Sequence, residues 1–196
     1  MRALVGEIRV HRLVAEVNDF QSLLLDYPSG SADFDRYLFL PVGVPLTDSW
    51  EPPAVYSENV RLPEPDIFAV SGTWRYAMTA ETRERLGMTV EYMTEFLPLG
   101  PQRDDLLLLN VLHNVNCLDA ERSDVDCIFK RYVFLEHRLS ESALFQVPET
   151  DSVDTLLLER DDDDEPGLRS IVEHDGLTGI SFELVWSSLT GPHVVL

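Results

Sequence analysis

Residues 105–118, which read DLLLLNVLHNVNCL, decide the fold of this chain. In their second half, positions 111, 113, 115 and 117 fall on one face of an extended chain, and positions 112, 114, 116 and 118 fall on the other. A period of two residues is typical of a β-strand, because successive side chains of a strand point to opposite faces. The stretch therefore predicts a long strand at the centre of a sheet.

Shorter segments on both sides of this stretch carry the same β signal. Strands are expected over residues 3–14, 35–42, 67–70, 89–97, 129–135, 144–147 and 180–186, and residues 155–158 form a short apolar run that ends in an acidic loop. Six prolines between Pro41 and Pro65 exclude a helix in that interval, since proline lacks the backbone N–H that a helix needs. This interval is expected to wrap over the sheet in an extended form, with Trp50 docked into the core.

Two helices are expected. Thr79 has the side chain of an N-cap for a helix over residues 80–86, which Gly87 closes. A second helix fits residues 166–174, because a proline stands near its start and Gly176 follows its end.

The few helices do not alternate regularly with the strands, so the fold class is α+β, with a mostly antiparallel sheet and a few short helices. The chain has 196 residues, which suits a single domain over 1–196. One continuous hydrophobic core is expected, and its members are Trp50, Trp74, Val111, Val115, Leu118, Phe129, Phe134, Phe145, Ile180 and Phe182.

Charge narrows the possible partners. The chain carries 35 acidic and 15 basic residues, a net charge of −20. Such a surface repels nucleic acids and anionic membranes and attracts basic proteins. Glu7 and Arg9 interrupt the start where a signal peptide needs an apolar segment, and no apolar run approaches the roughly 20 residues that span a bilayer. The protein is therefore expected to be cytoplasmic, with its two cysteines reduced.

The sequence lacks the common catalytic signatures: nucleophile elbow, phosphate-binding loop, zinc-protease motif and dinucleotide-binding motif. We therefore expect neither an enzyme nor a cofactor. His113, Cys117, Cys127 and His137 are zinc-ligand types, but on a strand positions 113 and 117 lie about 13 Å apart, too far for one ion. No metal site is expected, and both thiols are expected to pack as small apolar groups.

The acidic run Asp161, Asp162, Asp163, Asp164 and Glu165 is the strongest local concentration of charge. It fails as a calcium loop, because Pro166 takes the place of the required glycine and Val172 the place of the final glutamate. Residues 149–165 hold nine acids and one arginine, a net charge of −8. Two interpretations stay open: a solvated loop extended by self-repulsion, or an electrostatic contact for a basic partner.

An ordered set of short motifs then resembles a known family. The motifs are Asp48-Ser49-Trp50-x-Pro52, Pro65-Asp66-Ile67-Phe68, Leu108-Leu109-Asn110-Val111, Val115-Asn116-Cys117-Leu118-Asp119-x-Glu121-x-Ser123, Phe129-x3-Val133-Phe134, Leu144-Phe145-x-Val147-Pro148 and Gly176-Leu177-Thr178-Gly179-Ile180-x-Phe182. Together they resemble a bacterial immunity-protein family, immunity family eleven of the polymorphic toxin systems. The likeness covers about residues 35–187. Residues 1–34 match no segment of the family and are expected to form a strand-rich extension.

The resemblance implies an α+β protein that binds and neutralises a cognate secreted toxin inside the producing cell. It does not identify the toxin, which the net charge predicts to be basic. Asp161–Glu165 are then the candidate toxin contacts, whereas Asp119 and Ser123 are expected to fix a turn through local hydrogen bonds. A carboxylate-dependent enzyme and a general protein-interaction scaffold stay open as alternatives.

Overall fold

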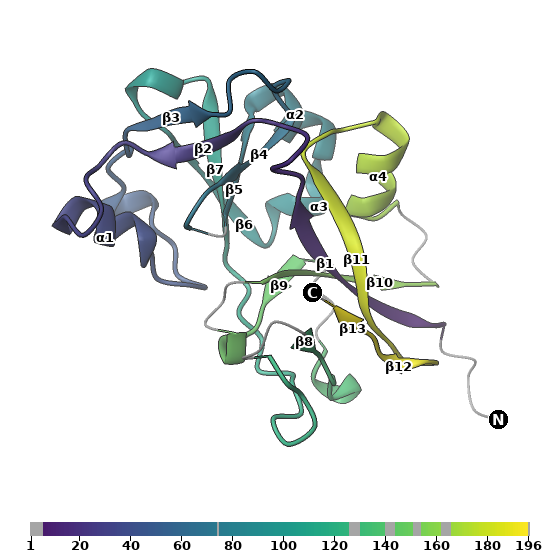
Figure 1. The fold of residues 1–196 in the computed structure, drawn as a ribbon. Coiled ribbons are helices and arrows are strands. Elements are labelled where there is room, and N and C mark those ends of the chain that lie inside the picture. The colour runs from purple at the N-terminus through teal and green to yellow at the C-terminus, as the bar shows by residue number, and fades with distance from the viewer. Residues whose placement is uncertain are drawn as a thin grey trace.

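Two twisted sheets form the frame of the computed structural model, which describes residues 6–73, 75–125, 130–139, 144–150, 154–161 and 166–195 (Figure 1). The five-stranded sheet has, in spatial order, the strands β12 (Gly191–Pro192), β11 (Ile180–Ser187), β1 (Ile8–Ala15), β10 (Thr155–Arg160) and β9 (Leu144–Gln146). The six-stranded sheet has the order β3 (Val55–Glu58), β2 (Ser22–Leu25), β4 (Ile67–Val70), β5 (Arg75–Thr79), β7 (Leu106–Val111) and β6 (Thr94–Pro98). A separate ribbon pairs β13 (Val194–Val195) with β8 (Lys130–Arg131).

Strand pairing is antiparallel throughout these sheets except between β2 and β4. Four short α-helices accompany the sheets: α1 (Ala32–Leu38), α2 (Ala80–Leu86), α3 (Met88–Glu91) and α4 (Leu168–Asp175). Short 3-10 turns are η1 (Thr47–Ser49), η2 (Pro101–Arg103), η3 (Glu136–Arg138) and η4 (Pro148–Thr150). The predicted fold class, α+β with mostly antiparallel strands, is confirmed.

The helix α2 has the predicted bounds. The Thr79 hydroxyl accepts a hydrogen bond from the Thr82 amide at 3.1 Å, and Gly87 follows the last residue. The helix α4 begins two residues later than expected and ends, as predicted, before Gly176. Both helices are specified by local signals, and both pack their buried leucines against the space between the sheets.

The strand predicted over residues 35–42 is wrong, because its first half belongs to α1. The Ser31 hydroxyl caps this helix by accepting from the Phe34 amide at 3.1 Å, and Asp33 and Asp35 lie in the first turn, where negative charge favours a helix. Tyr37 is buried and stacks on Tyr27, with ring centroids 5.5 Å apart. Capping and this aromatic contact therefore outweigh the β preference of the aromatic residues.

The long strand predicted over residues 105–118 is also wrong in its second half. The strand β7 ends at Val111, and the chain then crosses from the six-stranded sheet toward β9 of the five-stranded sheet. There the Val115 amide donates to the Gln146 carbonyl, and the Gln146 amide donates to the His113 carbonyl, both at 2.8 Å. The alternating pattern thus belongs to an extended segment that joins the two sheets.

Two other predicted strands are shorter than expected. Of residues 89–97, the first part completes α3 and only Thr94–Pro98 pairs, as β6. Of the predicted strand over 129–135, the structure describes residues 130–135, and within these only Lys130 and Arg131 form a strand, while Phe134 makes an isolated bridge to Leu118. The first predicted strand, over residues 3–14, begins at Ile8.

The prediction of one continuous core is wrong, because the buried apolar residues form three clusters on successive sheet faces. The central core lies between the sheets and includes Leu13, Ile67, Met78, Leu109, Leu157 and Ile180. The outer core covers the far face of the five-stranded sheet and includes Val10, Leu118, Tyr132, Phe134, Phe145 and Trp186. The N-terminal core covers the far face of the six-stranded sheet and includes Leu23, Tyr37, Val55, Phe68, Leu97 and Leu108.

The expected core residues divide among these clusters. Val111, Ile180 and Phe182 belong to the central core, Val115, Leu118, Phe134 and Phe145 to the outer core, and Trp50 to the N-terminal core. Trp74 and Phe129 lie outside the described residues. A sheet buried on both faces needs a separate apolar layer on each, so alternate residues of one strand enter different clusters.

The wrapping segment predicted between Pro41 and Pro65 is only partly confirmed: Val55–Glu58 do not lie over the six-stranded sheet but join it as the edge strand β3, and Thr47–Ser49 form the 3-10 turn η1. Trp50 anchors it as expected: its indole N–H donates to the Pro98 carbonyl at 2.8 Å, and its ring packs edge-on against Tyr37. The sheet curls around the N-terminal core until its two edges meet. The Gly100 amide donates to the Pro53 carbonyl at 3.1 Å, next to a bridge between Ala54 and Gly100.

Candidate functional site

A cavity of about 450 Å³ opens between the two sheets, where β1 passes the turn that joins β4 to β5. Leu13, Ala15 and Val17 line it from the five-stranded sheet, and Ala69 and Gly72 line it from the six-stranded sheet. This volume lies within the range of ligand sites in proteins, roughly 300–1,000 Å³. Its walls are mostly apolar, so it suits an apolar group better than a charged one.

The polar end of the cavity contains Arg12 and Asp154. Asp154 is buried, and its carboxylate accepts hydrogen bonds from the Lys130 ammonium and the Tyr132 hydroxyl, each at 2.6 Å. Arg12 lies 4.0 Å from Asp154 and donates to Glu183 at 2.6 Å. Burial, and then the nearby Asp154 charge, raise the pKa of the Tyr132 phenol, so its proton stays in the bond to Asp154. The positive charges of Arg12 and Lys130 thus balance the negative charges of Asp154 and Glu183.

Tyr76 closes the cavity toward the central core and ties the sheets together. Its hydroxyl, on β5, donates to the Leu13 carbonyl on β1 at 3.0 Å. Burial raises the pKa of this phenol above its usual range, and the Asp154 charge adds to the effect. The hydroxyl therefore remains a donor at every physiological pH, and the wall it forms is fixed.

Arg75 holds the wrapping segment against the end of the same sheet. Its buried guanidinium donates to the Asn110 side chain and to the carbonyls of Leu40, at 3.2 Å, and Pro41, at 3.3 Å. Burial lowers the pKa of Arg75 to about 10, against an opposing effect of the Glu95 charge. The guanidinium remains protonated at neutral pH and fixes the path of residues 40 and 41.

Glu95 completes this clamp from the other side of Asn110. Its carboxylate accepts from the Asn110 amide at 2.7 Å, from the Thr47 hydroxyl at 2.6 Å and from the Leu46 amide. Burial raises the pKa of Glu95, but the hydrogen bonds from Thr47, Asn110 and Leu46 lower it more, and the net direction is down. A charged carboxylate on the sheet thus secures the far end of the segment at residues 46 and 47.

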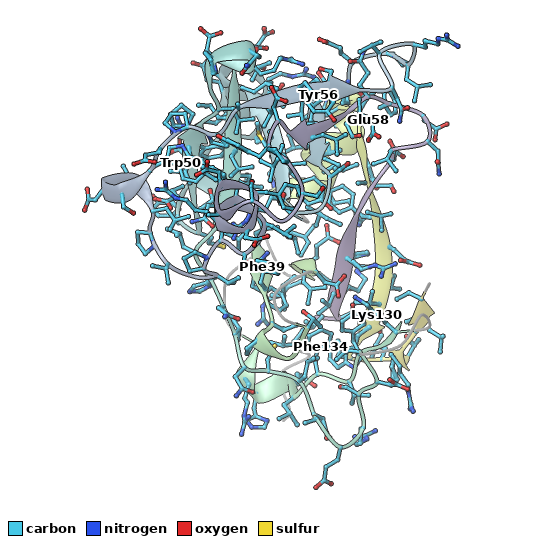
Figure 2. The ribbon with its side chains drawn as sticks, turned by 60° about the vertical axis from the view of Figure 1, so that its left-hand side comes forward. Phe39, Trp50, Tyr56, Glu58, Lys130 and Phe134 are labelled. Atoms are coloured by element: carbon cyan, nitrogen blue, oxygen red, sulfur yellow. The ribbon has the colours of Figure 1, made fainter. Side chains whose placement is uncertain are left out.

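The clamped segment leaves Phe39 exposed beside the cavity. Phe39 is 73% exposed, although the Leu40 carbonyl next to it is held by Arg75. The Leu38 side chain lies close to Gly72, a residue of the cavity wall. Figure 2 places Phe39 near the middle of the face that comes forward, with Trp50 and Tyr56 above it and Phe134 below. An aromatic ring in water next to an apolar cavity is a candidate binding feature.

The same part of the chain is strongly acidic. Residues 16–51 contain seven acids and a single basic residue, Arg36, a net charge of −6. Arg36 forms an ion pair with Glu51, so its charge is locally compensated. Asp33, Asp35 and Asp48 are exposed. We call residues 16–51 the acidic N-terminal segment.

Of the predicted contact run, the structure describes only Asp161, which lies away from this segment. Asp161 is exposed, forms an ion pair with Arg9, and its amide donates to the Glu7 carbonyl at 3.1 Å. Asp162, Asp163, Asp164 and Glu165 lie outside the described residues. Two other acids of residues 149–165 do not contribute to a free patch, because Asp154 is buried beside Lys130 and Glu159 forms an ion pair with Arg169 at 3.0 Å.

The zinc-type side chains are scattered. Cys117 is fully buried in the outer core, as expected, and Cys127 lies outside the described residues. His113 lies in the crossover between the sheets, and His137 in η3. In the part of the chain that the structure describes, no group of three or more His, Cys, Asp or Glu side chains is placed to hold a metal ion.

Asp119 and Ser123 fix a turn, as predicted. The Asp119 carboxylate accepts from the Glu121 amide at 3.2 Å, and its carbonyl accepts from the Ser123 amide at 2.8 Å. The Ser123 hydroxyl accepts from the Val133 amide at 3.0 Å and donates to the Val133 carbonyl at 3.2 Å. The motif residues at this point are therefore structural.

Two other motifs meet in space although 112 residues separate them. The Asp66 carboxylate accepts from the Thr178 amide and hydroxyl, both at 2.9 Å, while the Asp66 amide donates to the Thr178 hydroxyl at 3.1 Å. This pair joins the entry of β4 to the entry of β11, and so holds the two sheets together. Neither segment carries a pattern in the sequence that would predict this contact.

Comparison with known proteins identifies no relative: no family model matches the chain, and no curated protein matches it. The resemblance to the immunity family therefore stays a prediction. Among the described residues, no helix is long and apolar enough to cross a membrane.

No local pattern in the sequence predicts the cavity. Arg12, Asp154 and Phe39 come from three separate parts of the chain and form no local motif. A weak signal existed only for Phe39, which stands in the apolar run Leu38–Leu40 before two closely spaced prolines.

Proposed function

We propose that this protein is an immunity protein, which binds a cognate basic toxin domain in the cytoplasm and neutralises it without catalysis. One observation carries the proposal: many of the basic side chains form ion pairs with carboxylates of the same chain. Among the described residues, nine basic side chains form ion pairs with carboxylates, namely Arg9, Arg12, Arg36, Arg83, Arg85, Arg103, Arg122, Lys130 and Arg169. The surface left over is strongly negative and complements a positive protein.

The ordered motifs support the proposal from the sequence side. Their residues lie at structural joints, as Asp66 with Thr178 and Asp119 with Ser123 illustrate. A shared scaffold with a variable surface is what one family needs to bind many different toxins.

The catalytic alternative has a weaker physical basis. Among the described residues that line the cavity, Asp154 is the carboxylate, and Lys130 and Tyr132 already donate to it at 2.6 Å. A general acid or base must lie within hydrogen-bonding distance of a substrate proton, whereas the Asp154 carboxylate is already hydrogen-bonded to Lys130 and Tyr132.

The proposal is tested by rescue from toxicity. If a large secreted protein is encoded beside this chain, as the proposal predicts, the probe is the C-terminal domain of that protein, expressed in a host cell with and without this chain. Rescue of growth, together with a 1:1 complex of the purified proteins, is the expected result. Growth arrest despite abundant folded protein would reject the function.

A further inference from the structure

We propose that the cavity between the sheets and the exposed Phe39 beside it form the surface on which the toxin docks, with an apolar toxin side chain entering the cavity. The inference rests on the proposed function and names the surface that this function uses. It replaces the acidic run at residues 161–165 as the centre of the contact.

The cavity is built to receive an apolar group. Leu13, Ala15, Val17 and Ala69 supply apolar walls, and two charged groups of the lining form ion pairs: Asp154 with Lys130, and Arg12 with Glu183. The third, Arg75, donates hydrogen bonds to Asn110 and to the Leu40 and Pro41 carbonyls. An entering aliphatic or aromatic side chain therefore loses water without facing a charged group that lacks polar partners. Side chains that fill such pockets supply most of the binding energy in protein interfaces.

Phe39 offers the complementary feature, a projecting ring. The hydrogen bonds from Arg75 to the Leu40 and Pro41 carbonyls hold its backbone in place, so little conformational entropy is lost when the ring is covered. Aromatic residues that stand in fixed positions on a surface are typical anchors of interfaces.

The negative charge of the acidic N-terminal segment favours a basic partner at this surface. The acidic N-terminal segment carries seven acids and one base, and that base, Arg36, is paired with Glu51. Exposed Asp33 and Asp35 lie on α1, whose last residue adjoins Phe39. Lysine and arginine side chains around the apolar toxin residue would meet these carboxylates at the rim of the contact, where opposite charges speed association.

The proposed docking surface also extends beyond the cavity. A neighbouring shallow hollow of about 580 Å³ shares Val17 with it and is lined by Asn59, Val60 and Leu62. Val60 is itself 71% exposed. A stable protein contact covers about 800 Å² of each partner, which the cavity alone would not supply.

Two substitutions test the surface with the same purified toxin domain as probe. Phe39→Ser removes the ring, and Ala69→Phe fills the cavity from its β4 wall. Each is expected to weaken binding at least about tenfold, mainly through faster dissociation, while the unfolding temperature of Phe39→Ser stays that of the wild type. The matched controls are Leu189→Ser, which removes a side chain 77% exposed on the β11–β12 turn, and Ala80→Phe at the exposed start of α2; both are expected to bind like the wild type.

The outcomes separate the two proposals. If the wild type binds the toxin domain and Phe39→Ser and Ala69→Phe bind it with unchanged affinity, the docking surface is overturned and the immunity function stays in place. Absence of wild-type binding would overturn the function, and the surface with it. Should Ala69→Phe fail to fold, Phe39→Ser alone decides, because that side chain is already in water.

Discussion

At the scale of single residues, Gly179 allows the chain entering β11 to pass close to β4 of the other sheet. Its φ is +100°, and a Cβ at this position would lie 2.1 Å from the Ile67 carbonyl oxygen and 2.6 Å from the Pro65 Cβ. Gly179→Ala is therefore expected to lower the free energy of unfolding by about 3 kcal/mol or more, from backbone strain and overpacking together. Urea denaturation measures the change.

Gly176 provides the matched control for this substitution. Its φ is +63°, but a Cβ there would meet no atom within 4 Å. Gly176→Ala then costs only the left-handed backbone, about 1 kcal/mol. Equal losses for both variants would show that the contact with Ile67 does not matter.

His11 makes stability depend on pH. Its buried ring has a pKa lowered to about 4, first by burial and then by the charges of Arg169 and Arg9, against an opposing effect of Glu173. In the unfolded chain the pKa is about 6.5, so as the pH falls from 6.5 toward 4 the unfolded state takes up a proton that the folded state refuses. The contribution of this group to stability is therefore lost across that window.

The loss through His11 is expected to be about 2 kcal/mol after an allowance for solvent screening. The measurement compares wild type with His11→Gln, because the variant keeps a polar side chain of similar size and removes the titration of this ring. On going from pH 7 to pH 4.5, the stability of the variant relative to wild type is expected to rise by that amount. A difference that does not change with pH would mean that His11 is protonated in the fold.

At the scale of elements, the turn that follows Leu118 depends on one carboxylate. Asp119→Ala removes the bond to the Glu121 amide and is expected to lower the free energy of unfolding by about 1 kcal/mol, with toxin binding retained. Glu121→Ala, at an exposed position in the same turn, is the control and is expected to be neutral. Loss of neutralisation by a fully stable Asp119→Ala would show that the residue contacts the toxin.

Elements with local signals were predictable from the sequence, and those that depend on distant partners were not. The start and end of α2 follow from Thr79 and Gly87, which act within the helix itself. The end of β7 at Val111 depends on Gln146, 35 residues further along, which draws the chain to the other sheet. Nothing in the alternation of residues 111–118 marks that departure.

The strand β11 shows the same limit within one element. The period of two in the sequence predicts that its even-numbered residues share one face of the strand. Phe182 nevertheless packs in the central core and Trp186 in the outer core. The pairing with β1 shifts between Val10 and His11, where Leu184 and Trp186 face successive residues and Val185 is extra. One extra residue reverses the faces, since the side-chain period is two. Such a bulge is set by the neighbouring strand.

At the scale of the whole molecule, the net charge follows from the composition, but the distribution of the charged groups over the surface does not. The net charge of −20 is independent of the fold. The fold decides which charges face water: it buries Asp154, pairs Asp161 with Arg9, and leaves Asp33 and Asp35 of the acidic N-terminal segment exposed. The candidate site likewise needed the fold, because its cavity exists only where β1 passes the β4–β5 turn.

This distribution gives the run at residues 161–165 a role that kinetics can test. Asp162, Asp163 and Asp164 are changed together to asparagine, while Asp161 stays to keep its ion pair with Arg9. If these charges steer the toxin toward a contact centred on Phe39, association is expected to slow several-fold at low salt, with dissociation unchanged. Screening shortens the reach of exposed charges from about 30 Å at 0.01 M salt to about 8 Å at 0.15 M, so the rates of variant and wild type are expected to converge.

The control for this variant also removes three carboxylates, at the exposed positions of Glu81→Gln, Glu84→Gln and Asp104→Asn. Because it lowers the net charge equally, it separates a local effect from the general attraction between an acidic and a basic protein. Slower association of the run variant than of this control assigns steering to residues 162–164. Equal rates leave the run as a solvated loop, whereas faster dissociation of the run variant would place the run inside the contact and move the docking surface away from Phe39.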